Sequence, residues 1–294
     1  NLHHVRSSHI NTNARHSLSR PGRVSAMFSV RHSCAVAISL ALIHFSLPAV
    51  AADENSSGWT ITLKANGGLS PAWEGSKDLS PYLLPGLSIR RAGTPLTFSA
   101  PDDSPGFAIY DEGWLKAGVV GKLKGPRSSV EHTELKGVHD IDWTIEAGLF
   151  AEFWPMEKLR ARVEVRRGLI GHHGDIVDIS ADWVERRGRW TISAGPRLSL
   201  ADTRYMDKLF GANAAEAGLN GHIGAYRAEG GPKLVGLAGA VSYEWSKSWT
   251  TTVYARYNRL VGSASASPLV DKLGSRNQLT IGAIVAYSFD WAGF

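Results

Sequence analysis

The sequence predicts an all-β fold, a transmembrane antiparallel up-and-down β-barrel of about twelve strands. Three observations support it: apolar and polar residues alternate with a period of two, aromatic residues gather at strand ends, and short connections alternate with long polar ones. Residues 159–165 show the period clearly, because Leu, Ala, Val and Val alternate with Arg160, Arg162 and Glu164. Such strands have one apolar and one polar face.

Strand length separates a membrane barrel from a soluble sandwich, whose apolar face would be a core. Most of the expected strands have about 10 to 13 residues, against a usual 5 or 6, and this length suits a tilted bilayer crossing. The third and fourth are short, so they can also be one bent strand or a bulged hairpin, which leaves ten strands as an alternative. The twelve expected strands are 58–66, 83–91, 95–99, 106–110, 113–123, 140–154, 158–168, 174–185, 188–201, 232–245, 249–261 and 277–290.

Aromatic residues and loop lengths predict the orientation of the barrel. Amphipathic rings are most stable at the lipid headgroups, and bacterial barrels place short turns in the periplasm and long loops outside. The long connections are 125–139, 203–231 and 262–276. The expected girdle beside the short turns consists of Phe153, Trp154, Trp183, Trp190, Trp245 and Trp249.

The amino-terminus has the three regions of a secretory signal peptide. Met27 precedes a short basic stretch with Arg31, an apolar run, and the small residues Ala49-Val50-Ala51, so residues 27–51 are expected to be removed. Residues 1–26 are interpreted as unstructured, translated upstream sequence, and residues 52–294 as the barrel of a Gram-negative outer membrane.

Removal of residues 1–51 changes the charge balance of the chain. The segment holds five arginines and no acid, so 32 − 5 = 27 basic residues remain beside 27 acidic ones. A nucleic-acid partner therefore loses its main support. Cys34, the only cysteine, leaves with the segment.

The polar face of the strands is expected to line a charged lumen, because an arginine at the lipid midplane costs roughly 2–4 kcal/mol. If Trp154 opposes Lys158 across a turn at 155–157, Glu152 lies opposite Arg160 and Glu146 opposite Arg166. The same inward set is predicted to include Asp178, Asp182, Arg197, Glu244 and Arg256.

One cluster, His172, His173 and Asp175, invites a catalytic interpretation. Adjacent histidines on a strand point to opposite faces, and Gly171 and Gly174 are more simply the residues of a tight turn. The sequence also has no Gly-x-Ser-x-Gly or His-Glu-x-x-His motif. We therefore expect no enzyme activity and no catalytic, cofactor-binding or metal-binding residues.

Several segments resemble the MipA/OmpV family of outer-membrane proteins. They are GLSPAWEGS (68–76), GHHG (171–174), YMDKLFG (205–211), AYRAEGGPK (225–233), SPLV (267–270), GSRNQ (274–278) and AYSF (286–289). Two departures are Leu209, where the family usually has an aromatic residue, and the extension 290–294 after the expected terminal Phe289. We expect Phe289 to close the last strand and 290–294 to form a periplasmic tail, since Phe294 has the opposite parity.

The resemblance implies a scaffold or adaptor for peptidoglycan-remodelling enzymes, with a lytic transglycosylase and a penicillin-binding protein as partners. Outer-membrane lipid and the barrel assembly machinery are the other expected partners. Two alternatives remain open, a narrow channel for small solutes or drugs and a surface adhesin that acts through 203–231.

Overall fold

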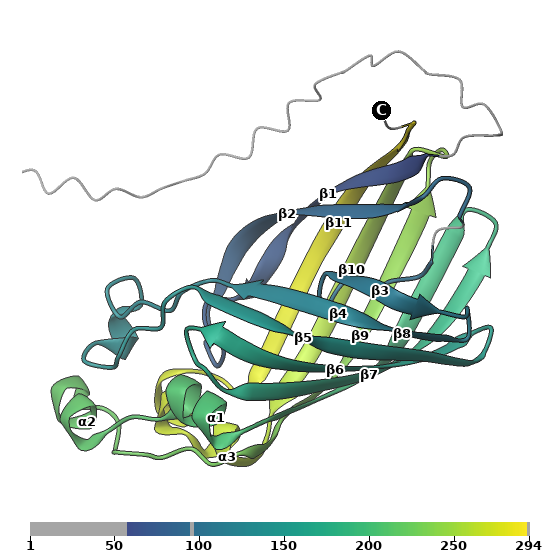
Figure 1. The fold of residues 1–294 in the computed structure, drawn as a ribbon. Coiled ribbons are helices and arrows are strands. Elements are labelled where there is room, and N and C mark those ends of the chain that lie inside the picture. The colour runs from purple at the N-terminus through teal and green to yellow at the C-terminus, as the bar shows by residue number, and fades with distance from the viewer. Residues whose placement is uncertain (1–57, 95–96, 293–294) are drawn as a thin grey trace, which may run out of the picture. The chain divides into compact units, whose positions relative to one another are not determined.

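Eleven antiparallel strands form one sheet in the computed structural model, which describes residues 58–94 and 97–292 (Figure 1). Strands adjacent in sequence pair with one another except β2 and β3, and β1 also pairs with β11, so the sheet curls into a near barrel. The strands are β1 (Trp59–Pro71), β2 (Leu79–Arg91), β3 (Gly106–Asp111), β4 (Leu115–Lys124), β5 (Thr144–Met156), β6 (Leu159–Ile170), β7 (Asp175–Arg187), β8 (Trp190–Ala201), β9 (Gly231–Glu244), β10 (Trp249–Leu260) and β11 (Asn277–Trp291).

The strand number differs from the expected twelve and from the alternative ten. The expected third strand, 95–99, is not a strand in its described part, 97–99. Instead, residues 97–105 fold around a turn at 101–103, in which Asp103 accepts a hydrogen bond from the Ala100 amide at 2.8 Å. Residues 97–105 of the connection between β2 and β3 lie in the lumen.

The missing strand leaves β2 and β3 as the two edges of the sheet. Neighbouring strands in the sheet alternate in direction. β2 and β3, the first and the last of the eleven strands in sheet order, therefore run in the same direction. β2 contains Pro81 and Pro85, residues that sheets tolerate on edge strands. The sequence of β2 therefore suits its place at an open edge.

The predicted charged lumen is confirmed by burial along β6. Arg160 and Arg166 are 0% and 1% exposed, whereas Val163 and Val165, on the other face, are 38% and 50% exposed. Glu244 shares the parity of the buried Ala240, as predicted, but it is exposed at the end of β9 and makes no ion pair among the described residues.

The predicted register between β5 and β6 is wrong by two residues. Glu152 lies opposite Arg162 rather than Arg160, because the turn lies at 157–158 instead of 155–157 and the ladder is irregular between Phe153 and Met156. A shift of two keeps every side chain on its face. The two predicted ion pairs therefore form diagonally: Arg160 to Glu152 at 2.8 Å, and Arg166 to Glu146 at 2.8 Å.

The connections divide the sheet into two ends. The turn end has the short turns 112–114, 157–158, 188–189 and 245–248, and the other end carries every helix of the described residues (Figure 1). We call the long connections 125–143, 202–230 and 261–276 the loop cap. It contains η1 (Thr133–Leu135), α1 (Thr203–Phe210), α2 (Ala214–Asn220), α3 (Gly262–Ala266) and η2 (Leu269–Leu273).

The apolar core lies in the loop cap rather than inside the barrel. Tyr205, Met206 and Phe210 of α1 are fully buried and cluster with Leu260 and Val270. A second cluster joins residues of 72–78 to η1 and η2. The cap is therefore a packed structure that covers one end of the lumen.

Aromatic side chains line the turn end, with one exception to the prediction. Phe153, Trp183, Trp190, Trp245 and Trp249 are exposed there. Trp154 is the exception, because its indole N–H donates to the carboxylate of Glu152 at 2.9 Å. The girdle thus has five of its six expected members.

The last strand reaches Trp291, two residues beyond Phe289. Trp291 pairs with Trp59 and Asp290 with Thr60, whose hydroxyl donates to Asp290 at 2.5 Å. The prediction of a tail is therefore wrong for Asp290 and Trp291, because both residues pair with β1. Phe294 and the segments 1–26 and 27–51 lie outside the described residues.

Candidate functional site in the lumen and the loop cap

Buried arginines and carboxylates fill the middle of the lumen. Arg160 donates to Glu152 at 2.8 Å and to Asp182 at 3.0 Å. Arg166 donates to Glu146 at 2.8 Å and to Asp178 at 2.5 Å, and it also pairs with Glu164. Buried charges of this kind persist only when they are paired, so the network is a cross-linked filling.

The segment 97–105 lies inside the lumen among these charges, and we call it the plug. Asp103 accepts hydrogen bonds from Arg160, the shorter at 2.6 Å, and Asp102 accepts from Arg197 at 2.7 and 3.1 Å. Its entry is from the turn end, where Phe98 packs on Trp154 with ring centroids 6.2 Å apart. Sequence reasoning missed this plug; its signal was an Asp-Asp pair between prolines.

Local geometry presents the two aspartates to the wall. Asp103 accepts hydrogen bonds from the Ala100 amide at 2.8 Å and the Ser99 hydroxyl at 3.2 Å, which fold the segment into a tight turn. The Ser104 amide donates to Glu164 at 3.2 Å. The plug is thus held mainly by side chains, and residues 97–105 take part in no strand ladder.

A second cluster lies around Tyr205, beneath the loop cap. The Tyr205 hydroxyl donates to Glu74 at 2.8 Å and accepts from Lys124 at 2.7 Å and Lys233 at 3.1 Å. Asp202 caps α1 by accepting from the Tyr205 amide at 2.8 Å, which positions the ring. Four separate elements meet here, so the arrangement could not be read from sequence spacing.

Charge and burial fix the ionisation of this cluster. Burial alone would raise the pKa of Glu74, but the charges of Lys124 and Lys233 outweigh it and hold that pKa well below its usual value. Burial and the charge of Glu74 raise the pKa of Tyr205 well above its ordinary value. The phenol therefore remains a neutral hydrogen-bond donor that ties α1 to the barrel wall.

The histidine cluster is divided by the structure. His172 is buried: its Nδ1 accepts from the Gly174 amide at 3.0 Å, and its Nε2 faces Glu146 at 3.1 Å. His173 is exposed and adopts a positive φ of 54°. Gly171 has a φ of 91°, so the tight turn predicted there is present. His172 belongs to the lumen network.

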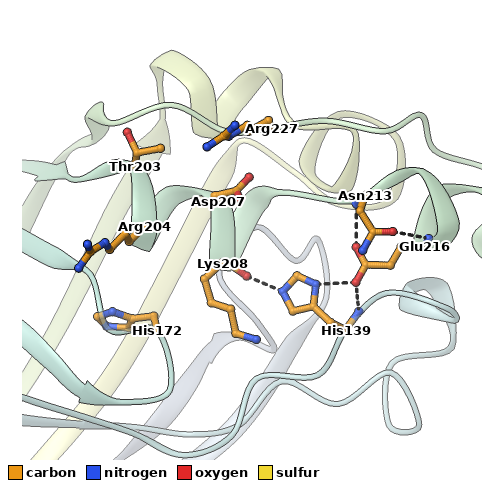
Figure 2. Close-up of a pocket in the computed structure, with 9 residues that line it drawn as sticks. All are labelled: His139, His172, Thr203, Arg204, Asp207, Lys208, Asn213, Glu216 and Arg227. Carbon is orange, nitrogen blue, oxygen red and sulfur yellow. Dashed lines mark hydrogen bonds and ion pairs between the residues drawn. The ribbon is translucent and has the colours of Figure 1, made fainter.

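An open pocket of about 540 Å³ lies on the loop cap (Figure 2). His139 forms part of its wall: Nδ1 contacts Glu216 at 2.9 Å and Nε2 contacts the Lys208 carbonyl at 2.8 Å. Arg204 and Arg227 also line it and are exposed. The pocket was not predicted, because 203–231 was expected to be an irregular loop.

Metal and membrane-helix features are absent from the described part of the chain. No group of three or more His, Cys, Asp or Glu residues is placed there to hold a metal ion. None of the described helices has the length and hydropathy needed to cross a membrane.

An apolar exterior, a charged interior and long loops at one end define an outer-membrane β-barrel. The chain belongs to the MipA family: the family profile described as "MltA-interacting protein MipA" matches residues 64–289. This assignment supports a non-catalytic role. The matched range includes the lumen network, the plug and the Tyr205 cluster.

Solved outer-membrane proteins are only distantly similar. Neisserial surface protein A (NspA) is 13% identical with a TM-score of 0.27, and the match covers 80% of this chain and 100% of that chain. The COG4313 outer-membrane channel from Pseudomonas putida F1 is 12% identical with a TM-score of 0.36, over 81% and 100%. Similarities of this size carry no argument about function. No curated protein matches the sequence.

Proposed function

We propose that the protein is a non-catalytic scaffold of the outer membrane whose turn end faces the periplasm and holds peptidoglycan-remodelling enzymes. The family name, MltA-interacting protein, supports a lytic transglycosylase as one partner. The segments that resemble the family add a penicillin-binding protein as a second. The short turns give this end a rigid surface, because each turn joins two hydrogen-bonded strands.

One observation carries the choice of scaffold over channel: the lumen is filled at two levels. The plug occupies its middle through Asp102 and Asp103, and the Tyr205 cluster closes it under the loop cap. A diffusion channel needs a continuous water-filled path. If the lumen is not used for transport, the protein acts through its outer surface and its two ends, as a scaffold does.

The proposal includes processing of the amino-terminus. Residues 27–51 act as a signal peptide, and the mature chain starts at Ala52. Amino-terminal sequencing of the protein purified from outer membranes tests this, since any other starting residue contradicts the assignment.

Site-specific photo-crosslinking in cells tests the scaffold role. A photoreactive residue is placed at Arg187 or Lys247, both in or beside turns of the turn end, and in a control variant at Gly218 on α2. The two turn positions are expected to give an adduct with the lytic transglycosylase, identified by mass spectrometry. Gly218 should give none, because it lies on the opposite end.

Two results would overturn the scaffold role. One is the absence of a transglycosylase adduct from the turn positions when the enzyme is present at normal levels. The other is an adduct from Gly218 alone, which would place the partner outside the cell.

A further inference from the structure

Four arginines gather around the plug and have more donor capacity than the barrel wall satisfies. They are Arg160 and Arg162 on β6, Arg197 on β8 and Arg256 on β10. Among the described residues, Asp102 is the only ion-pair partner of Arg256, at 3.8 Å. The Nε atoms of Arg160 and Arg256 are buried without a hydrogen-bond partner. The side chains of the barrel wall therefore satisfy only part of the charge and hydrogen-bond donors of this cationic cluster.

The two carboxylates that complete the cluster come from the plug. Arg197 donates two hydrogen bonds to the carboxylate of Asp102. Asp103, together with Glu152 and Asp182, forms ion pairs with Arg160. Two parallel N–H···O bonds are the preferred geometry between a guanidinium and a carboxylate. Asp102 and Asp103 thus occupy the cluster as a ligand would.

The plug is held mainly by side-chain contacts, whereas a strand is held by a continuous ladder of backbone hydrogen bonds. Residues 97–105 belong to no ladder and accept one backbone hydrogen bond from the wall, from the Gly121 amide to the Pro105 carbonyl at 2.9 Å. Their other contacts with the wall run chiefly through Asp102, Asp103, Phe98 and the Ser104 amide.

Departure of the plug would leave Arg256 without its only ion-pair partner among the described residues. Arg160 and Arg197 would each lose one carboxylate and keep Asp182. Such a loss of compensation is costly in a protein interior. Another anion of matching geometry would then be favoured in its place.

We propose that the arginine cluster of Arg160, Arg162, Arg197 and Arg256 is a binding site for paired carboxylates, which Asp102 and Asp103 fill as a built-in ligand in the closed barrel. The ligand class is a small molecule or a short acidic peptide with two carboxylates close together. It enters from the turn end, because the plug itself enters there. The proposal uses the filled lumen and is independent of the scaffold role.

A replacement of the plug tests the site directly. Residues 98–104 are replaced by a Gly/Ser segment of the same length, and the folded barrel is identified by its heat-modifiable mobility. Its melting temperature is measured with N-acetyl-Asp-Asp-amide, with succinate and with N-acetyl-Asn-Asn-amide at constant ionic strength. The acidic dipeptide is expected to raise it saturably, by roughly 5–10 °C at about a hundredfold excess over the dissociation constant.

Control variants assign the effect to the cluster. The wild-type protein, whose site is filled, should not respond, and Arg197→Ala in the replaced background should lose the response. A response to the dipeptide alone supports an acidic peptide as ligand, and a response to succinate as well supports any paired carboxylate. No response, or an equal response to the Asn-Asn dipeptide, overturns the proposal. If the replaced barrel does not fold, Asp102→Asn/Asp103→Asn, which removes both built-in carboxylates and keeps the length of the plug, undergoes the same assay with the same outcomes.

Discussion

Arg197 holds Asp102 through two hydrogen bonds, Nε to Oδ2 at 2.7 Å and Nη2 to Oδ1 at 3.1 Å, although 95 positions separate them in the sequence. Arg197 also donates to Asp182 at 2.8 Å, so β7, β8 and the plug meet at one guanidinium. This contact joins a connection without strand structure to the wall of the barrel. The closed lumen depends on it more than on any backbone pairing of the plug.

The pair Glu146 and Arg166 should be strongly coupled in stability. Arg166→Ala leaves Glu146 buried without its 2.8 Å partner, and loss of one member of a buried pair costs about 3–5 kcal/mol. Glu146→Ala/Arg166→Ala should recover part of this, with a coupling of about 0.5–3 kcal/mol in thermal or denaturant unfolding. The exposed pair Lys158 and Glu185 is the control and should couple by about 0.2–1 kcal/mol. Additive losses at the buried pair would show that its members do not interact.

Thiol labelling of intact cells should distinguish the two ends. Gly218→Cys, on exposed α2, is expected to react with a membrane-impermeant maleimide, and Ser246→Cys, in the β9–β10 turn, is not. Permeabilisation of the outer membrane serves as the control, because it should make Ser246→Cys reactive. Labelling of Ser246→Cys in sealed cells would reverse the orientation.

Acid should weaken the loop cap at Glu216. Burial alone would raise the pKa of Glu216, but hydrogen bonds from the Asn213 amide and from His139 outweigh it and lower that pKa. A lowered folded-state pKa contributes stability above the ordinary glutamate pKa, near 4.3, and this is lost as the pH falls through the folded value. Wild type should therefore melt above Glu216→Gln at pH 6, and the gap should close below about pH 4. A gap that is constant with pH would mean that the charge of Glu216 has no such role.

The end of β11 should be needed for assembly. Phe289 is exposed on the lipid side and its ring stacks on Tyr287 at 5.9 Å, so Phe289→Asp should cause periplasmic accumulation and degradation. Deletion of residues 292–294, beyond the β1–β11 ladder, should leave heat-modifiable barrel in the outer membrane. Normal assembly of Phe289→Asp, together with failure of the deletion, would place the signal at Phe294.

Prediction from sequence succeeded where one physical rule decided the outcome. Charges at every second position of β6 cannot face lipid, so the inward face of Arg160, Arg162 and Arg166 followed from the period alone. The register did not follow, because a pattern of period two shows neither the position of the turn, 157–158 rather than 155–157, nor the irregular ladder between Phe153 and Met156. The predicted pairs survived only because arginine reaches a diagonal partner.

The plug and the Tyr205 cluster depend on contacts between distant parts of the chain. Asp103 meets Arg160 across 57 positions, and Tyr205 meets Glu74 across 131. A short apolar stretch such as 95–99 looks like a strand when only local pattern is used, and the neglected signal was the Asp102-Asp103 pair that follows it. The chemistry of His172 was likewise set by Glu146, which lies on another strand.

Single-channel recording in planar bilayers tests the closed lumen most directly. Folded wild-type protein, purified from outer membranes and confirmed by heat-modifiable mobility, should insert and give no conductance steps, because the plug and the Tyr205 cluster fill the lumen. A monomeric porin reconstituted in the same way is the positive control. Reproducible conductance steps from the wild-type barrel would contradict the closed lumen and favour the channel role.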